Sequence, residues 1–90
     1  MIIARFSGEL CKLTNGEEEV RLSANSVLEC INNLEERFPG SKDKICDNQG
    51  EVLASISVFV NGDNINMLEG MQTPLKEGDE VDFMSAFAGG

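Results

Sequence analysis

Ninety residues with a mass of 9.8 kDa suffice for one small domain, near the size at which burial barely outweighs chain entropy. Sixteen acidic residues against seven basic ones give a net charge of −9, which argues against nucleic acid as a partner. No apolar run approaches the roughly 20 residues that span a bilayer, and the N-terminus lacks a signal-peptide pattern, so we expect a soluble cytoplasmic protein with no membrane partner.

Few residues are available for chemistry. The chain has no histidine, so catalysis would depend on carboxylates, thiols or the active site of a partner. The three cysteines, Cys11, Cys30 and Cys46, are odd in number and too far apart for the close pairs of a zinc site. We expect reduced, mostly buried thiols, and no metal or cofactor bound by this chain.

The first half of the sequence predicts a β-hairpin followed by a helix. Residues 2–7 and 19–22 alternate apolar and polar side chains, and Asn15-Gly16 between them favours a tight reversal, although the register stays open. Ser26 and Glu29 fit the capping box of a helix over residues 26–38. Its apolar residues recur at helical spacing, and Pro39-Gly40 ends it.

The second half predicts a loop and three strands. Residues 41–51 are polar and form the longest expected loop, anchored by Ile45 and Cys46. The remaining elements expected in chain order are a strand at 52–60, a turn at 61–64, a short strand at 65–68, a helical turn at 73–75 and a last strand at 80–87. The alternation predicts these side chains on the inner face of the sheet: Ile56, Val58, Val60, Val81 and Phe83.

This order of elements predicts an α+β fold. A mixed sheet of four to five strands with one main helix across one face lets the apolar helix stripe and one sheet face cover each other. If the first and last strands pair in parallel at the centre, the arrangement is the β-grasp, or ubiquitin-like, fold. We expect one domain over residues 1–86 and a flexible C-terminal tail over residues 87–90.

The C-terminus is the most informative feature. Gly89 and Gly90 carry no side chains, so they can thread a narrow channel and bring the terminal carboxylate into the active site of another protein. Residues 87–90, fully extended, reach about 13–14 Å. A carboxylate is a poor electrophile and needs activation, most simply as an acyl-adenylate. The alternative is an ordinary terminus without a role.

Several motifs resemble the MoaD/ThiS family of ubiquitin-like sulfur carriers. They are Phe59-Val60-Asn61-Gly62, Leu68-Glu69-Gly70, Thr73-Pro74-Leu75, Gly78-Asp79-Glu80-Val81 and Ala88-Gly89-Gly90. The resemblance implies a β-grasp carrier, not an enzyme, whose Gly90 is adenylated by a partner similar to ubiquitin-activating enzymes. That partner would use ATP and magnesium, and a persulfide would convert Gly90 to a thiocarboxylate. Gly89 would give access, while Phe87 and Ala88 would position the tail.

The parity of the strands suggests a docking surface. Phe59 and Met84 are expected on the open face of the sheet, and the candidate partner-binding residues are Phe59, Met84, Ser85, Ala86, Phe87 and Ala88. The expected partners are the adenylating enzyme and a sulfur-accepting subunit or protein. The pathway expected first for the carried sulfur is molybdopterin synthesis, in which this chain would be the non-catalytic small subunit of molybdopterin synthase.

Three alternatives stay open. The family also contains carriers for cysteine or thiamine synthesis. A second class resembles the small archaeal modifiers, in which the same carboxylate forms isopeptide bonds to lysines. A third is a non-covalent binding module whose terminus has no role.

Overall fold

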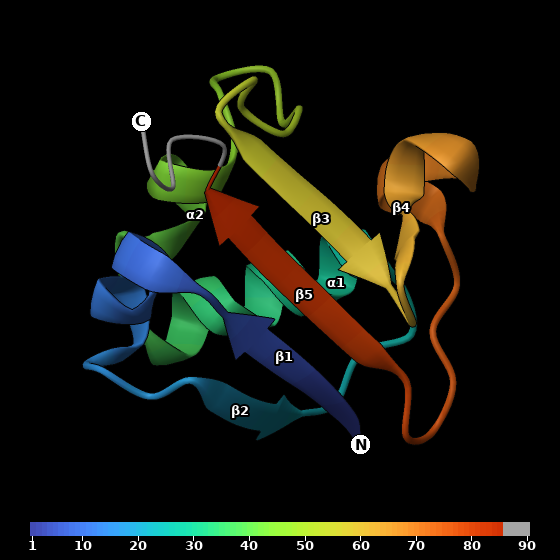
Figure 1. Cartoon of the computed structure of the whole chain (residues 1–90), viewed down its shortest axis with the longest axis horizontal. Coiled ribbons are helices and arrows are strands. Elements are labelled where there is room, and N and C mark those ends of the chain that lie inside the picture. Colours follow the sequence, from blue (N-terminus) through green and yellow to red (C-terminus); the bar gives the residue numbers. More distant parts are fainter. Residues whose placement is uncertain (86–90) are drawn as a thin grey trace.

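Five strands form one mixed sheet in the computed structural model, which describes residues 1–85 (Figure 1). They are β1 (Ile2–Phe6), β2 (Glu19–Leu22), β3 (Ile56–Val60), β4 (Asp63–Asn64) and β5 (Glu80–Ser85), in the spatial order β2-β1-β5-β3-β4. The central strands β1 and β5 are parallel, and the other pairings are antiparallel. The predicted β-grasp arrangement is therefore confirmed.

The β1–β2 hairpin is confirmed, with Ile2 opposite Leu22 and Arg5 opposite Glu19. The segment that connects the two strands is not extended, because Gly8–Thr14 forms a 3₁₀ helix, η1. Asn15, with a φ of 57°, ends η1 in the left-handed conformation that asparagine tolerates. The turn dipeptide therefore serves as the C-terminus of a short helix.

Helix α1 (Val27–Arg37) lies across one face of the sheet, behind it in Figure 1. The Ser26 hydroxyl accepts the N–H of Glu29 at 3.1 Å, and the Glu29 carboxylate accepts the N–H of Asn25 at 2.8 Å. Each side chain thus satisfies a backbone donor at the start of the helix, as the capping box predicts. The helix buries Val27, Cys30, Ile31 and Leu34 against the sheet.

The loop prediction for residues 41–51 was partly wrong. Ser41–Ile45 forms a second short helix, α2, while Ile45 and Cys46 are buried as expected. The Glu35 carboxylate of α1 accepts the N–H groups of Gly40 at 3.0 Å and Lys42 at 2.9 Å. A side chain from a neighbouring helix therefore fixes α2, which the local sequence could not reveal.

Three later boundaries also differ. β3 begins at Ile56 and not at residue 52, because the Ile56 N–H turns back to the carbonyl of Leu53. The predicted strand at 65–68 is a 3₁₀ helix, η2 (Ile65–Met67), which starts where the Asn64 side chain accepts the Asn66 N–H. The helical turn lies at η3 (Gly70–Gln72) and not at 73–75.

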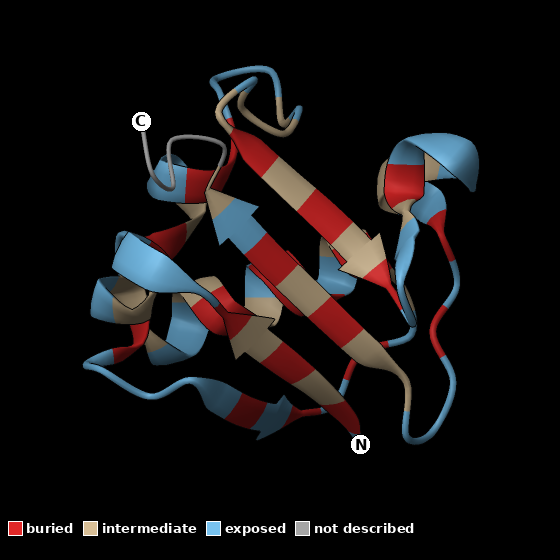
Figure 2. Ribbon diagram, in the orientation of Figure 1, coloured by how far each residue is buried: buried red, intermediate tan, exposed pale blue. Residues whose placement is uncertain are grey.

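Burial alternates along the strands, as Figure 2 shows. The five side chains predicted to face inward are all buried: Ile56, Val58, Val60, Val81 and Phe83. Cys30 and Cys46 are buried and Cys11 is half-buried, and all three are free thiols. Burial raises the pKa of the Cys30 thiol to about 12, so this thiol stays protonated at neutral pH.

Glu35 makes stability depend on pH. Hydrogen bonds from the Gly40 and Lys42 N–H groups favour its ionised form and hold its pKa below the ordinary 4.5. A lowered folded-state pKa means that this stabilisation is complete above the unfolded-state value and is lost as the pH falls through the folded-state value. As the pH falls below about 4.5, we therefore expect the free energy of unfolding to decrease less for Glu35→Gln than for wild type.

Thermal unfolding of both proteins from pH 7 to pH 2.5 tests this prediction. The exposed neighbour Glu36 provides the matched control as Glu36→Gln. Parallel pH profiles for Glu35→Gln and wild type would contradict the assigned role.

Candidate functional site

The last described residue, Ser85, ends the central strand β5. Ser85 lies opposite Ile56 of β3, and the Phe83 carbonyl accepts the N–H of Ser7 at 3.2 Å. The end of β5 is therefore held between β3 and the start of η1. The remaining predicted site residues, Ala86, Phe87, Ala88, Gly89 and Gly90, and with them the whole predicted tail, lie outside the described residues.

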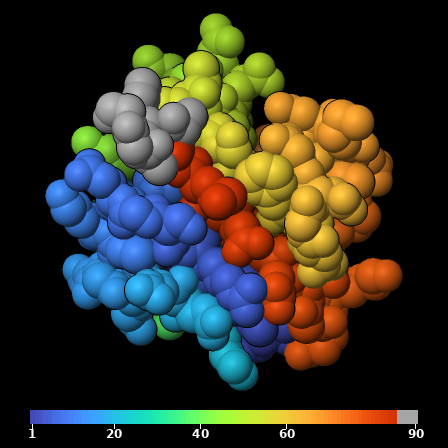
Figure 3. All heavy atoms as spheres, viewed as in Figure 1, coloured from blue at the N-terminus to red at the C-terminus, as the bar shows by residue number. Residues whose placement is uncertain are grey.

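Phe59 and Met84 lie on the face of the sheet opposite α1. Phe59 is half-buried, and the Met84 side chain is 42% exposed. Phe59 is opposite Asp82, and Met84 is opposite Ser57, so the two apolar side chains are diagonal neighbours across the β3–β5 pair. Figure 3 shows this face, with the atoms of β5 at the surface between β1 and β3.

Charged side chains surround this apolar pair. Arg5 of β1 forms ion pairs with Glu80 at 2.7 Å and Glu19 at 3.2 Å, and it lies opposite Asp82 in the β1–β5 register. All of these side chains are partly or fully exposed. Exposed ion pairs contribute little stability, so their main effect here is to fix a charge pattern on the open face.

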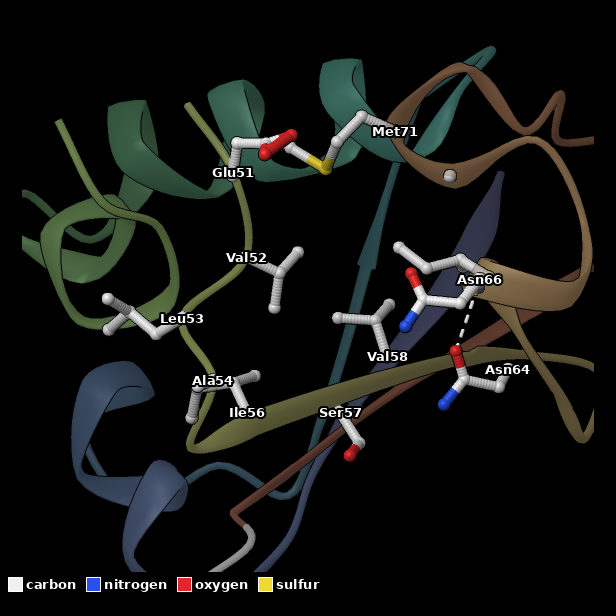
Figure 4. A pocket seen from close by; sticks show the side chains of 12 residues that line it. Glu51, Val52, Leu53, Ala54, Ile56, Ser57, Val58, Asn64, Asn66 and Met71 are labelled. Carbon is white, nitrogen blue, oxygen red and sulfur yellow. Dashed lines mark hydrogen bonds between the residues drawn. The ribbon is translucent and has the colours of Figure 1, made fainter. Parts of the chain in front are cut away.

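A pocket of about 320 Å³ lies beside β3, on the side away from β5. Figure 4 shows that its wall contains apolar side chains, with the Asn64 and Asn66 side chains near the rim. The Asn64 oxygen is already occupied by the Asn66 N–H at 2.8 Å. The lining contains one carboxylate, Glu51, and no second group with which it could share acid–base work.

Within residues 1–85, no group of three or more cysteine, aspartate or glutamate side chains is placed to hold a metal ion. No helix in this part of the chain is long and apolar enough to cross a membrane.

The sequence did not single out Arg5 or Asp82. Both are outward residues of the two parallel central strands, and the parallel register places them side by side. Alternation along each strand gave their face, but only the strand order shows that Asp82 lies between Arg5 on β1 and Phe59 on β3.

The comparisons with known proteins agree on one family. The model of the ThiS family matches residues 4–90. An Archaeoglobus fulgidus protein, described provisionally as a sulfur carrier, is 33% identical over 87% of this chain and 89% of its own length.

Two solved structures are similar over almost the whole chain. The structure of the Amycolatopsis orientalis BexX/CysO complex contains a chain that superposes with a TM-score of 0.92 at 28% identity, covering 100% of both chains. Small archaeal modifier protein 1 from Methanosarcina acetivorans superposes with a TM-score of 0.83 at 29% identity, covering 99% of this chain and 95% of the other.

Proposed function

Because the chain belongs to the ThiS family of ubiquitin-like sulfur carriers, we propose that it carries sulfur as a thiocarboxylate on Gly90. The observation that supports this role most directly is that Gly89-Gly90 follows the central strand of a β-grasp sheet. Ser85 is anchored by β3, so the five residues that follow can reach roughly 16–18 Å from the sheet. That reach brings Gly90 into the active site of a partner.

The proposed reaction has two stages. A carboxylate oxygen of Gly90 attacks the α-phosphate of ATP on the partner, forming an acyl-adenylate and releasing pyrophosphate. The terminal sulfur of a persulfide then attacks the acyl carbon and displaces AMP, which leaves an acyl disulfide. A thiol reduces that disulfide and releases the thiocarboxylate, so ATP, magnesium and the persulfide all belong to partners.

The open face supplies the proposed docking surface for the activating enzyme. Phe59 and Met84 form an apolar contact, while the net charge of −9 favours a basic surface on the enzyme. The tail residues Ser85, Ala86, Phe87 and Ala88 would follow this contact into the active site. Association should therefore weaken as the salt concentration rises.

The sulfur acceptor is the finer part of the proposal. The similar chain named CysO favours cysteine synthesis over the molybdopterin destination expected from the sequence. The likeness to a small archaeal modifier supports the second candidate function, in which Gly90 is joined to lysines of other proteins. Products distinguish these destinations, because only the modifier leaves Gly-Gly remnants on lysine side chains.

Intact mass spectrometry tests the carrier function. After incubation with the cognate activating enzyme, ATP and a persulfide donor, we expect the protein to gain roughly 16 Da, as one oxygen is replaced by sulfur. Omitting ATP is the control and should leave the mass unchanged. An unchanged mass, measured with an activating enzyme whose activity has been demonstrated, would refute the proposal.

The docking surface makes a separate prediction. Replacing Phe59 and Met84 together by alanine should lower kcat/KM of the activating enzyme by at least about tenfold, because central apolar contacts dominate binding. Met67→Ala is the matched control, since Met67 is 82% exposed on η2 but lies outside the proposed surface. Equal rates for the double variant and the control would contradict the assigned surface.

A further inference from the structure

A cavity with basic side chains is lined by residues of η1, of the end of α1 and of α2. Its volume is about 330 Å³, and Lys12, Arg37 and Lys44 are among the residues that line it. Among residues 1–85, no acidic residue lines the cavity, although the chain contains sixteen acidic and seven basic residues. Three cations therefore gather at one place on a strongly acidic protein.

One of the residues that line the cavity has a buried polar atom without a partner within residues 1–85. Ser41 lines it and is 2% exposed, and the Ser41 hydroxyl makes no hydrogen bond to any other part of residues 1–85. A buried hydroxyl without a partner costs free energy, so such groups are rare in folded proteins. The hydroxyl therefore keeps an unused donor and acceptor beside the cavity.

The cations are held near the cavity but keep free donors. The Arg37 guanidinium donates to the Arg21 carbonyl at 2.6 Å and lies over the Phe38 ring at 5.7 Å, which leaves most of its five N–H groups unused. Lys12 contacts Glu9 at 3.7 Å in a fully exposed pair, which is a weak interaction. Lys44 forms no ion pair within the described residues.

The Glu35 carboxylate of α1 does not neutralise these cations. Glu35 lies outside the cavity lining, and its oxygens accept the backbone N–H groups of Gly40 and Lys42. Its charge is therefore committed to the α1–α2 connection. No described residue of the cavity lining therefore carries a negative charge that could neutralise the three cations.

We propose that this cavity binds the phosphate group of a small molecule. Three cations and a hydroxyl supply more donors and more charge than a single carboxylate can use, whereas a phosphate carries about −1.5 to −2 charge and three acceptor oxygens at neutral pH. The cavity shares no lining residue with the pair Phe59 and Met84 of the proposed docking surface. It gives the carrier a second ligand besides its activating enzyme.

Titration with inorganic phosphate, at an ionic strength held constant with sodium chloride, tests the proposal. We expect saturable amide shifts in NMR spectra, confined to residues 12–15 and 37–44. Because the ligand binds only the folded state, Tm should rise by about 7 °C at ten times the half-saturating concentration. A parallel titration with AMP shows whether a phosphate ester binds in the same place.

Matched variants separate the site from general charge effects. The double variant Lys12→Gln/Lys44→Gln should raise the half-saturating phosphate concentration by about tenfold or more, whereas Lys76→Gln, outside the cavity, should not change it. Ser41→Ala should also weaken binding while leaving Tm in chloride unchanged or higher, because it removes an unsatisfied hydroxyl. Ser57→Ala on the open face is its control.

Three outcomes would overturn the proposal. Equal amide shifts in the phosphate and chloride titrations would show that the salts only screen charges. A lower Tm of Ser41→Ala in chloride would show that the hydroxyl has a structural partner. Binding of an acidic peptide at these residues, without binding of phosphate or AMP, would make the cavity a protein contact.

Discussion

Deletion of Gly90 is expected to abolish thiocarboxylation completely. The shortened chain ends in Gly89, whose carboxylate stops about 3.5 Å short of the position that Gly90 reaches, and reaction rates depend steeply on such displacements. Intact mass spectrometry with the activating enzyme, ATP and a persulfide donor measures the loss. The same reaction with wild-type protein gives the reference.

A competition experiment separates reaction from binding. The described fold and both residues of the docking surface, Phe59 and Met84, are unchanged by the deletion, so the shortened protein should still inhibit activation of wild type. Its inhibition constant should lie within a few-fold of the wild-type KM. Unchanged function after the deletion would instead support a binding module whose terminus has no role.

Phe83→Ala is expected to have the largest effect on stability. Phe83 is fully buried in the central strand, and its ring stacks on that of Phe6 with centroids 5.0 Å apart. Truncation of a buried phenylalanine costs about 3–5 kcal/mol, because the cavity it leaves collapses only in part. A domain of this size has roughly 5–13 kcal/mol of stability, so the variant should be marginally folded.

The matched control is the next residue along β5. Met84→Ala changes a 42% exposed side chain on the other face of the same strand, and we expect a change within about 0.5 kcal/mol. Urea unfolding of both variants measures the difference. A similar loss of unfolding free energy for the two variants would show that Phe83 does not stabilise the core as its burial indicates.

The elements that the sequence predicted well are those whose signals are local. The Ser26–Glu29 capping box and the apolar spacing gave α1 almost to the residue, and alternation gave the inward side of β3 and β5. Where a side chain from elsewhere decides the backbone, prediction failed. Glu35 fixes α2, and Asn64 turns the expected fourth strand into η2.

The sequence by itself determined which side chains are available for chemistry: an acidic chain without histidine, with glycine at positions 89 and 90. Composition needs no folding to be known. Only the tertiary structure decided which side chains meet, because parallel pairing of β1 with β5 joins residues about 77 positions apart. That pairing places Arg5 beside Asp82, which is itself opposite Phe59 of β3, and helix packing gathers Lys12, Arg37, Lys44 and Ser41 around one cavity.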